Sequence, residues 1–328
     1  MIRLLCSTCL LPVSAFADVP AVMTDIAPVH SIAAQVMGDL GTPDLLLPPG
    51  ADPHDFALRP SDAARLGDAE LVIWVGEGLT PWLSEPLETL APQAAHISLL
   101  DVPGWERLDI RDVKDHGGHD DHKEHDDHEE HEEHEEHEEH EEHEEHAHDH
   151  GHDHGDFDPH AWLDPKIAGV WAQEIATQLG SIDPANAAIY NANADAAVTR
   201  FDALSEGISA QLAAVSDKAY VLPHDGYQYF EARFGLTAQA AIAGIDARSP
   251  GPAQIGALRD DMAANNVVCV FSDVAIGDRW AAVITEGTSA NTVQIDGIGR
   301  GHEAGPALYE AMMSRLADGF EVCLGNGM

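Results

Sequence analysis

The chain of 328 residues contains few basic residues: 16 Lys and Arg stand against 58 Asp and Glu, a formal net charge of −42. Nucleic-acid binding and docking on an anionic membrane both need clustered Lys and Arg, so this balance argues against both kinds of partner. Aromatic residues are sparse at 6%, but hydrophobic residues reach 44%. This content is enough for two ordinary domains that each bury a core.

Long hydrophobic runs are also absent, because no stretch approaches the 18 apolar residues that a membrane-spanning helix needs. The N-terminus has a short run at residues 4–13, preceded by Arg3 and followed by the sequence Ala-Phe-Ala at 15–17. This order is typical of a secretory signal peptide, so we expect residues 1–17 to be removed and the protein to be exported. The alternative is an ordinary apolar N-terminus.

Cysteine is scarce too, with four residues in the chain. Cys6 and Cys9 lie in the N-terminal apolar run and would leave with it, so Cys269 and Cys323 remain in the exported protein. An even pair in an oxidising compartment favours a disulfide, and two buried free thiols are the alternative. These two cysteines have no partners at the spacing of a zinc site.

The regular elements are short apolar runs that alternate with helical patterns, which indicates an α/β fold with parallel sheets. In the first half we expect strands at 21–23, 44–47, 71–75 and 96–99, and helices at 28–38, 61–67 and 81–90. Ser61 is expected to cap its helix and Pro81 to be the first residue of the next one. Another helix is expected to begin at Asp164-Pro165.

A long helical pattern separates this half from a second series of strands and helices. Apolar residues keep near-helical spacing from Asp183 to about Val215, long enough for a helix of roughly 45 Å that crosses a two-lobed molecule. We therefore expect an N-terminal lobe at 18–182, a linker helix at 183–216 and a C-terminal α/β lobe at 217–328.

A histidine-rich insertion at 112–156 interrupts the first lobe. It has 22 acidic residues, two lysines and 15 of the 21 histidines. Because like charges exclude a packed core, we expect disorder without metal and weak binding of metal at several sites. The alternative is a merely solvating acidic tract. The candidate ligands of this auxiliary loop are His116, His119, His122, His125, His128, His131, His134, His137, His140, His143, His146, His148, His150, His152 and His154.

Three other histidines follow predicted strands or lie in connecting loops, where α/β folds place ligands. His54, His160 and His224 each lie beside a proline that restricts the backbone. Asp296 ends a predicted strand and could supply an oxygen. Three imidazoles plus a carboxylate or water suit tetrahedral zinc, and they fit an all-oxygen calcium or magnesium site poorly. Trp74 and Trp162 are expected to pack rather than to contact a ligand, as is His30 on its helix, and His96 and His302 are expected at the surface.

Several segments, taken in order, resemble the zinc-specific solute-binding proteins of bacterial ABC importers (the ZnuA type). They are PHDFALRPSD from 53, AELVIWVG from 69, HAWLDP from 160, HDGYQYF from 224, CVFSD from 269 and DGIG from 296. The resemblance covers the whole mature chain. It implies two α/β lobes joined by one rigid helix, with metal between the lobes, and it supports a disulfide between Cys269 and Cys323.

The resemblance also implies roles for particular residues. His54, His160 and His224 match the zinc ligands. Manganese-type relatives have a carboxylate at the third position, so His224 favours zinc. Asp296 matches the fourth ligand of manganese-type relatives. In zinc types, the fourth ligand is a water or a Glu directly before the first histidine. This chain has Pro53 at that position, which leaves Asp296 or water as the fourth ligand.

The function that follows is zinc capture in the periplasm and delivery to an inner-membrane ABC permease, by a protein that is a monomer and not an enzyme. A periplasmic zinc buffer without a transport role is one alternative. A zinc-dependent hydrolase is another, but the chain lacks the motifs HExxH and GxSxG and no motif places a general base. Because neutral imidazoles bind zinc, we expect the affinity to fall below about pH 6.5.

Overall fold

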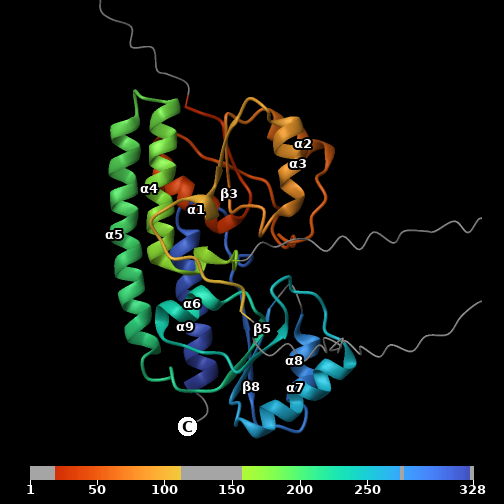
Figure 1. Cartoon of the computed structure of the whole chain (residues 1–328). Coiled ribbons are helices and arrows are strands. Elements are labelled where there is room, and N and C mark those ends of the chain that lie inside the picture. Colours follow the sequence, from red (N-terminus) through yellow and green to blue (C-terminus); the bar gives the residue numbers. More distant parts are fainter. Residues whose placement is uncertain (1–18, 112–156, 274–276, 326–328) are drawn as a thin grey trace, which may run out of the picture.

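The computed structural model describes residues 19–111, 157–273 and 277–325. The expected signal peptide and the histidine-rich insertion with its fifteen histidines therefore lie outside the described residues. Figure 1 shows two lobes, one above the other, and each lobe contains a four-stranded sheet. Within the described ranges, no helix has both the length and the apolar character needed to cross a membrane.

The N-terminal lobe is built on a parallel sheet with the strand order β2-β1-β3-β4. Its strands are β1 (Val22–Thr24), β2 (Asp44–Leu45), β3 (Leu71–Trp74) and β4 (Ala95–Ser98). The connections contain helices α1 (Ala27–Met37), α2 (Pro60–Gly67) and α3 (Ser84–Leu90), with 3-10 turns η1 (Gly38–Leu40), η2 (Pro81–Leu83) and η3 (Leu99–Asp101). All four residues of β3 are buried, as expected for an inner strand covered on both faces.

The C-terminal lobe repeats this topology in the order β6-β5-β7-β8, again with parallel neighbours. Its strands are β5 (Tyr220–His224), β6 (Ala240–Ala243), β7 (Cys269–Asp273) and β8 (Asn291–Ile295). Helices α6 (Gln228–Phe234), α7 (Pro252–Ala264) and α8 (Asp278–Thr285) connect them. The predicted fold class, two α/β lobes with parallel sheets, is confirmed.

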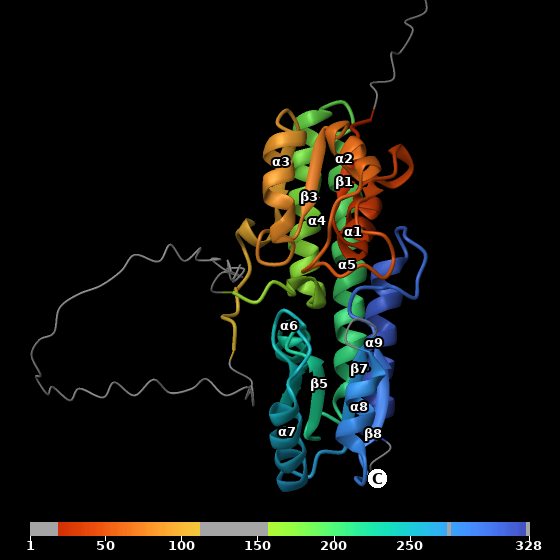
Figure 2. The ribbon, with the colours of Figure 1, turned by 90° about the vertical axis from the view of Figure 1, so that its right-hand side faces the viewer.

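The three longest helices of the described residues are α4 (Pro165–Ile182), α5 (Ala187–Leu212) and α9 (Leu308–Gly325), and α4 packs against α5. The 26 residues of α5 span about 39 Å, and the helix runs beside both lobes (Figure 2). α9 makes a second connection that the sequence pattern did not indicate. Its Tyr309 N–H donates to Ser31 of α1 at 3.0 Å, and its last turn carries Cys323. Two helices rather than one therefore tie the lobes.

Two local expectations were wrong. Ser61 is not a helix cap: α2 begins at Pro60, and Arg59 is the capping residue, whose N–H donates to Asp62 at 3.3 Å. The expected helix at 81–90 is divided into η2 and α3. Pro86 accounts for the division, because proline has no N–H to donate to the carbonyl four residues earlier.

The hydrophobic core does not divide cleanly between the lobes. Its largest cluster runs from α1 through α4 and α5 to α9, and it includes Trp171, Tyr190, Phe201 and Phe320. Smaller clusters fill the outer faces of the two sheets. Since the shared cluster is large and apolar, the lobes are expected to move little against each other.

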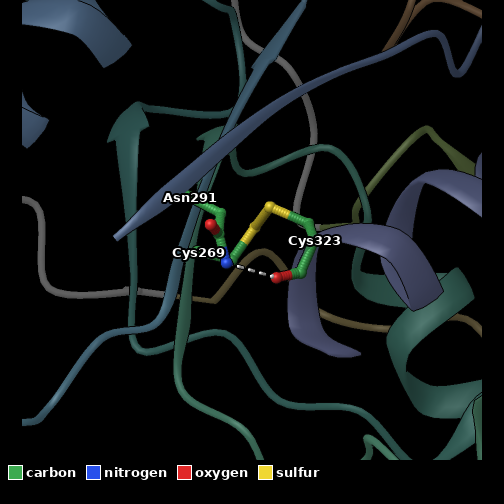
Figure 3. Close-up of a disulfide and its surroundings, with 3 residues drawn as sticks. All are labelled: Cys269, Asn291 and Cys323. Carbon is green, nitrogen blue, oxygen red and sulfur yellow. Dashed lines mark hydrogen bonds between the residues drawn. A yellow bond between two sulfur atoms is a disulfide. The ribbon is translucent and has the colours of Figure 1, made fainter. Parts of the chain in front are cut away.

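The disulfide between Cys269 and Cys323 is confirmed, with Cα atoms 5.6 Å apart (Figure 3). It ties β7 to the last turn of α9. The Asn291 side-chain amide of β8 also donates to the Cys323 carbonyl at 3.2 Å. The C-terminal helix is therefore fixed to two neighbouring strands of the second sheet.

Candidate metal centre

One pocket between the lobes brings together all four residues that the sequence indicated as ligands: His54, His160, His224 and Asp296. His54 lies in the loop after β2, and His160 precedes the 3-10 turn η4 (Ala161–Leu163). His224 is the last residue of β5, and Asp296 follows β8. Loops at the carboxyl ends of strands from both sheets thus line the pocket, which is where open α/β folds place ligands.

The spacing of the imidazoles fits a shared zinc ion. The ring centroid of His160 lies 5.4 Å from that of His54 and 5.4 Å from that of His224. Imidazoles that share one tetrahedral zinc, with Zn–N distances near 2.0–2.1 Å, would place their centroids about 5.2 Å apart. Both observed distances agree with this value.

Gly226 marks the point that two of the imidazoles face. A Cβ atom on this buried residue would lie 2.9 Å from Nε2 of His160 and 2.7 Å from Cδ2 of His224, and still closer to Nε2 of His224. The outer edges of both rings are therefore directed at the same small volume. That volume is open because residue 226 has no side chain.

The described residues do not include three His, Cys, Asp or Glu side chains already gathered around a metal position. The rings have the spacing of a zinc site, and adjacent ring planes are tilted by 53° and 61°. His54 is half-buried in its loop, whereas His160 and His224 are buried. Coordination of one ion by all three therefore requires side-chain rotation within the pocket.

Asp158 orients His160. One carboxylate oxygen, Oδ1, lies 2.9 Å from Nδ1 of the imidazole and accepts the backbone N–H of His160 at 2.8 Å. A proton on Nδ1 leaves Nε2 as the free lone pair that a metal binds. Asp158 is fully buried, and burial raises the pKa of its carboxyl to about 7. The hydrogen bond from the His160 backbone N–H acts in the opposite direction and lowers this pKa.

Asp273 has the corresponding place beside His224. Its Oδ2 lies 3.4 Å from Nδ1 of the imidazole, and both side chains are nearly buried. Asp273 lies in the segment CVFSD from 269, but the sequence alone did not indicate a role for it. The available signal was its position, because Asp273 ends β7, the strand paired next to β5.

The carboxylate of Asp296 is already engaged with its own loop. It accepts the backbone N–H groups of Ile298, Gly299 and Gly301 at 3.1, 2.9 and 3.1 Å. Asp52 also lines the pocket and accepts the His54 backbone N–H at 3.0 Å. Burial raises the pKa of Asp52, and the positive charge of Arg300 opposes this shift. Asp52, Asp273 and Asp296 are thus three oxygen donors around the histidines.

A buried ion pair beside the pocket was not anticipated. Arg111 of the N-terminal lobe donates through Nε to Asp225 at 2.9 Å and also contacts Glu231, both in the other lobe. Burial raises the pKa of Asp225 to about 6, although Arg111 opposes the shift. Asp109 and Phe157 pair as an isolated antiparallel bridge. Arg111, the last described residue before the insertion, therefore lies beside Asp225, which follows His224. Phe157, the first described residue after the insertion, lies three positions before His160.

The three other histidines of the described residues lie outside this pocket. His30 is buried in α1, and its Nε2 lies 2.9 Å from the carbonyl of Pro43. His96 is exposed as expected, while His302 is half-buried. Trp162 was expected to pack rather than to contact a ligand. The structure shows it buried against His160, with ring centroids 5.2 Å apart, on the wall of the pocket.

The geometry agrees with comparisons against known proteins. The model of a protein family described as the periplasmic component A of the zinc-uptake complex, ZnuA, matches residues 22–323. The chain belongs to this family. Members bind a solute rather than transform it, so the family is not one of enzymes.

Curated relatives within the family match almost end to end. The high-affinity zinc uptake system protein ZnuA of Paracoccus denitrificans is 44% identical over 310 residues, which are 94% of this chain and 93% of the relative. The protein of the same name from Brucella suis is 39% identical over 93% of this chain and 92% of its own length.

Solved structures share the fold. A crystal structure of ZnuA aligns with a TM-score of 0.73 at 20% identity, over 94% of this chain and all of the other. A zinc-bound ZnuA lacking its residues 138–173 aligns with a TM-score of 0.72 at 19% identity, over 94% of this chain and 98% of the other. At these identities the likeness shows the two-lobed fold.

Proposed function

We propose that this protein captures Zn²⁺ in the periplasm and delivers it to an inner-membrane ABC permease for zinc uptake. The observation that carries the proposal is the pocket that gathers His54, His160 and His224 from both lobes, with His160 at the spacing of a shared zinc from each of the other two. Family membership and the zinc uptake relatives support the same cargo. The protein acts as a monomer after removal of residues 1–17.

Zinc binding uses the three imidazoles through their Nε2 atoms. Asp158 holds the Nδ1 proton of His160, and Asp273 lies beside Nδ1 of His224, so two of the three rings have a carboxylate behind them. The hydrogen bond from Asp158 fixes the tautomer of His160 and increases the basicity of its metal-bound nitrogen. The fourth ligand is Asp296 or a water. Binding by Asp296 would cost part of its backbone hydrogen bonding, which favours water.

The histidine-rich insertion acts as a separate, weaker store of zinc. The bridge between Asp109 and Phe157 joins the two described residues that flank the insertion. Deletion of residues 115–154 should reduce the stoichiometry to about one zinc and leave the tight site intact. Loss of tight binding in the deletion variant would contradict this division of labour.

The proposal is tested by zinc competition with a chelator of high affinity, which reports the tight site alone. His54→Ala, His160→Ala and His224→Ala should each weaken tight binding by at least about a hundredfold, since each removes one of three protein ligands. His96→Ala is the matched control, because this exposed histidine lies outside the pocket. Equal affinity in all four variants would refute the site.

Transport is tested separately by uptake of radioactive zinc in cells that depend on this protein. The His160→Ala variant should lose uptake at low external zinc while the protein still reaches the periplasm. Zinc uptake that continues unchanged without the protein would reduce its role to that of a buffer.

A further inference from the structure

The six tryptophans differ in one respect, which is whether the indole N–H has a partner. The N–H groups of Trp74, Trp105, Trp171 and Trp280 are buried and have no hydrogen-bond partner in the described structure. The two that do have one are Trp82 and Trp162. Both donate to backbone carbonyls of loops that line the zinc pocket.

Trp82 supports the loop that carries His54. Its Nε1 donates to the carbonyl of Pro53 at 2.7 Å, one residue before the imidazole. Its ring also packs edge to face against Phe56 at 5.2 Å, two residues after His54. The loop after β2 is therefore held on both sides of its histidine by one indole that belongs to η2.

Trp162 supports the opposite wall and joins the lobes. Its Nε1 donates to the carbonyl of Gly297 at 2.7 Å, directly after Asp296. Its own carbonyl accepts the hydroxyl of Tyr309 in α9 at 2.7 Å, and its ring packs on His160. One buried side chain thus links an N-terminal-lobe ligand, the Asp296 loop of the other lobe and the helix that crosses between them.

We propose that Trp82 and Trp162 are positioning residues of the zinc site. Their N–H groups fix the carbonyls next to His54 and Asp296, so that the loops from both lobes keep the spacing that one ion needs. This inference rests on the proposed zinc site. The indole N–H groups of the four other tryptophans have no hydrogen-bond partner in the described structure. The need to fill volume therefore does not by itself explain why those of Trp82 and Trp162 have one.

The test replaces the indoles by phenylalanine, which keeps an aromatic ring and removes the donor. Trp82→Phe and Trp162→Phe should each weaken tight zinc binding about tenfold, equivalent to about 1.4 kcal/mol. Trp162→Phe should also release zinc faster, because its hydrogen bond joins the two walls of the pocket. The matched controls are Trp74→Phe and Trp171→Phe, which remove a buried indole without removing a hydrogen bond.

The absorption spectrum of bound Co²⁺ distinguishes positioning from general stability. Its visible bands report the ligand geometry of the site, so they should shift in Trp82→Phe and Trp162→Phe and stay unchanged in both controls. Unchanged spectra, or affinities equal to those of the controls, would overturn the inference.

His160→Ala in the same experiment separates the two proposals. If this variant retains tight binding, the zinc site itself is misplaced and the proposed function fails. If it loses tight binding while Trp82→Phe and Trp162→Phe behave like the controls, only the role of the tryptophans is wrong.

Discussion

Gly226→Ala is the perturbation for which the structure gives the most definite consequence. The added methyl would lie 2.9 Å from Nε2 of His160 and closer to Nε2 of His224. Ordinary carbon contacts need about 3.5 Å, so the His160 ring must retreat by roughly half an ångström and the His224 ring by more. Metal–ligand distances tolerate only about 0.2 Å, so at least one imidazole should leave the coordination sphere.

The expected result is a loss of tight zinc affinity of at least about a hundredfold, or 2.7 kcal/mol. Chelator competition measures the affinity, and thermal unfolding of the metal-free protein measures the cost of overpacking, which is about 1–3 kcal/mol. Gly256→Ala in α7 is the control, because a Cβ there would meet nothing within 4 Å. Affinity equal to that of the wild type in Gly226→Ala would show that the imidazoles do not face this point.

Three further outcomes are expected. Asp158→Asn should weaken tight zinc binding by about 10- to 100-fold in chelator competition, and an unchanged affinity would mean that Asp158 does not orient His160. Replacing Cys269 and Cys323 by serine should lower the free energy of unfolding by about 4 kcal/mol, since the disulfide closes a sequence separation of 54, and denaturation curves that coincide would contradict this. Burial lowers the pKa of His30 below 6.5, so the unfolded chain binds the proton more readily than the folded protein does. The free energy of unfolding should therefore fall as the pH drops below about 6.5. Between pH 8 and 5.5, with a chelator present, the His30→Gln variant should lose less of this free energy than the wild type.

The sequence predicted the lobes, the long helix and the disulfide because each leaves a local pattern. The apolar strands alternate with helical segments, the pattern of α5 continues without a proline, and two cysteines remain after export. The three histidines were singled out for a similar reason, since each directly follows a proline.

What the sequence did not indicate depends on contacts between distant residues. Trp162 and Gly297 are 135 positions apart, and Arg111 is 114 positions from Asp225. No local pattern reveals that such residues meet. The position of α9 across the lobes likewise depends on tertiary packing rather than on its periodicity, which resembles that of any helix covering a sheet.

The central claim is that one zinc ion lies between the lobes and is held by His54, His160 and His224. Anomalous diffraction at the zinc edge, on crystals of the full protein loaded with one equivalent of zinc, tests it most directly. The account predicts one strong peak within about 2.1 Å of Nε2 of all three histidines and a fourth ligand of oxygen. A peak outside the interlobe pocket, with these imidazoles unbound, would contradict it.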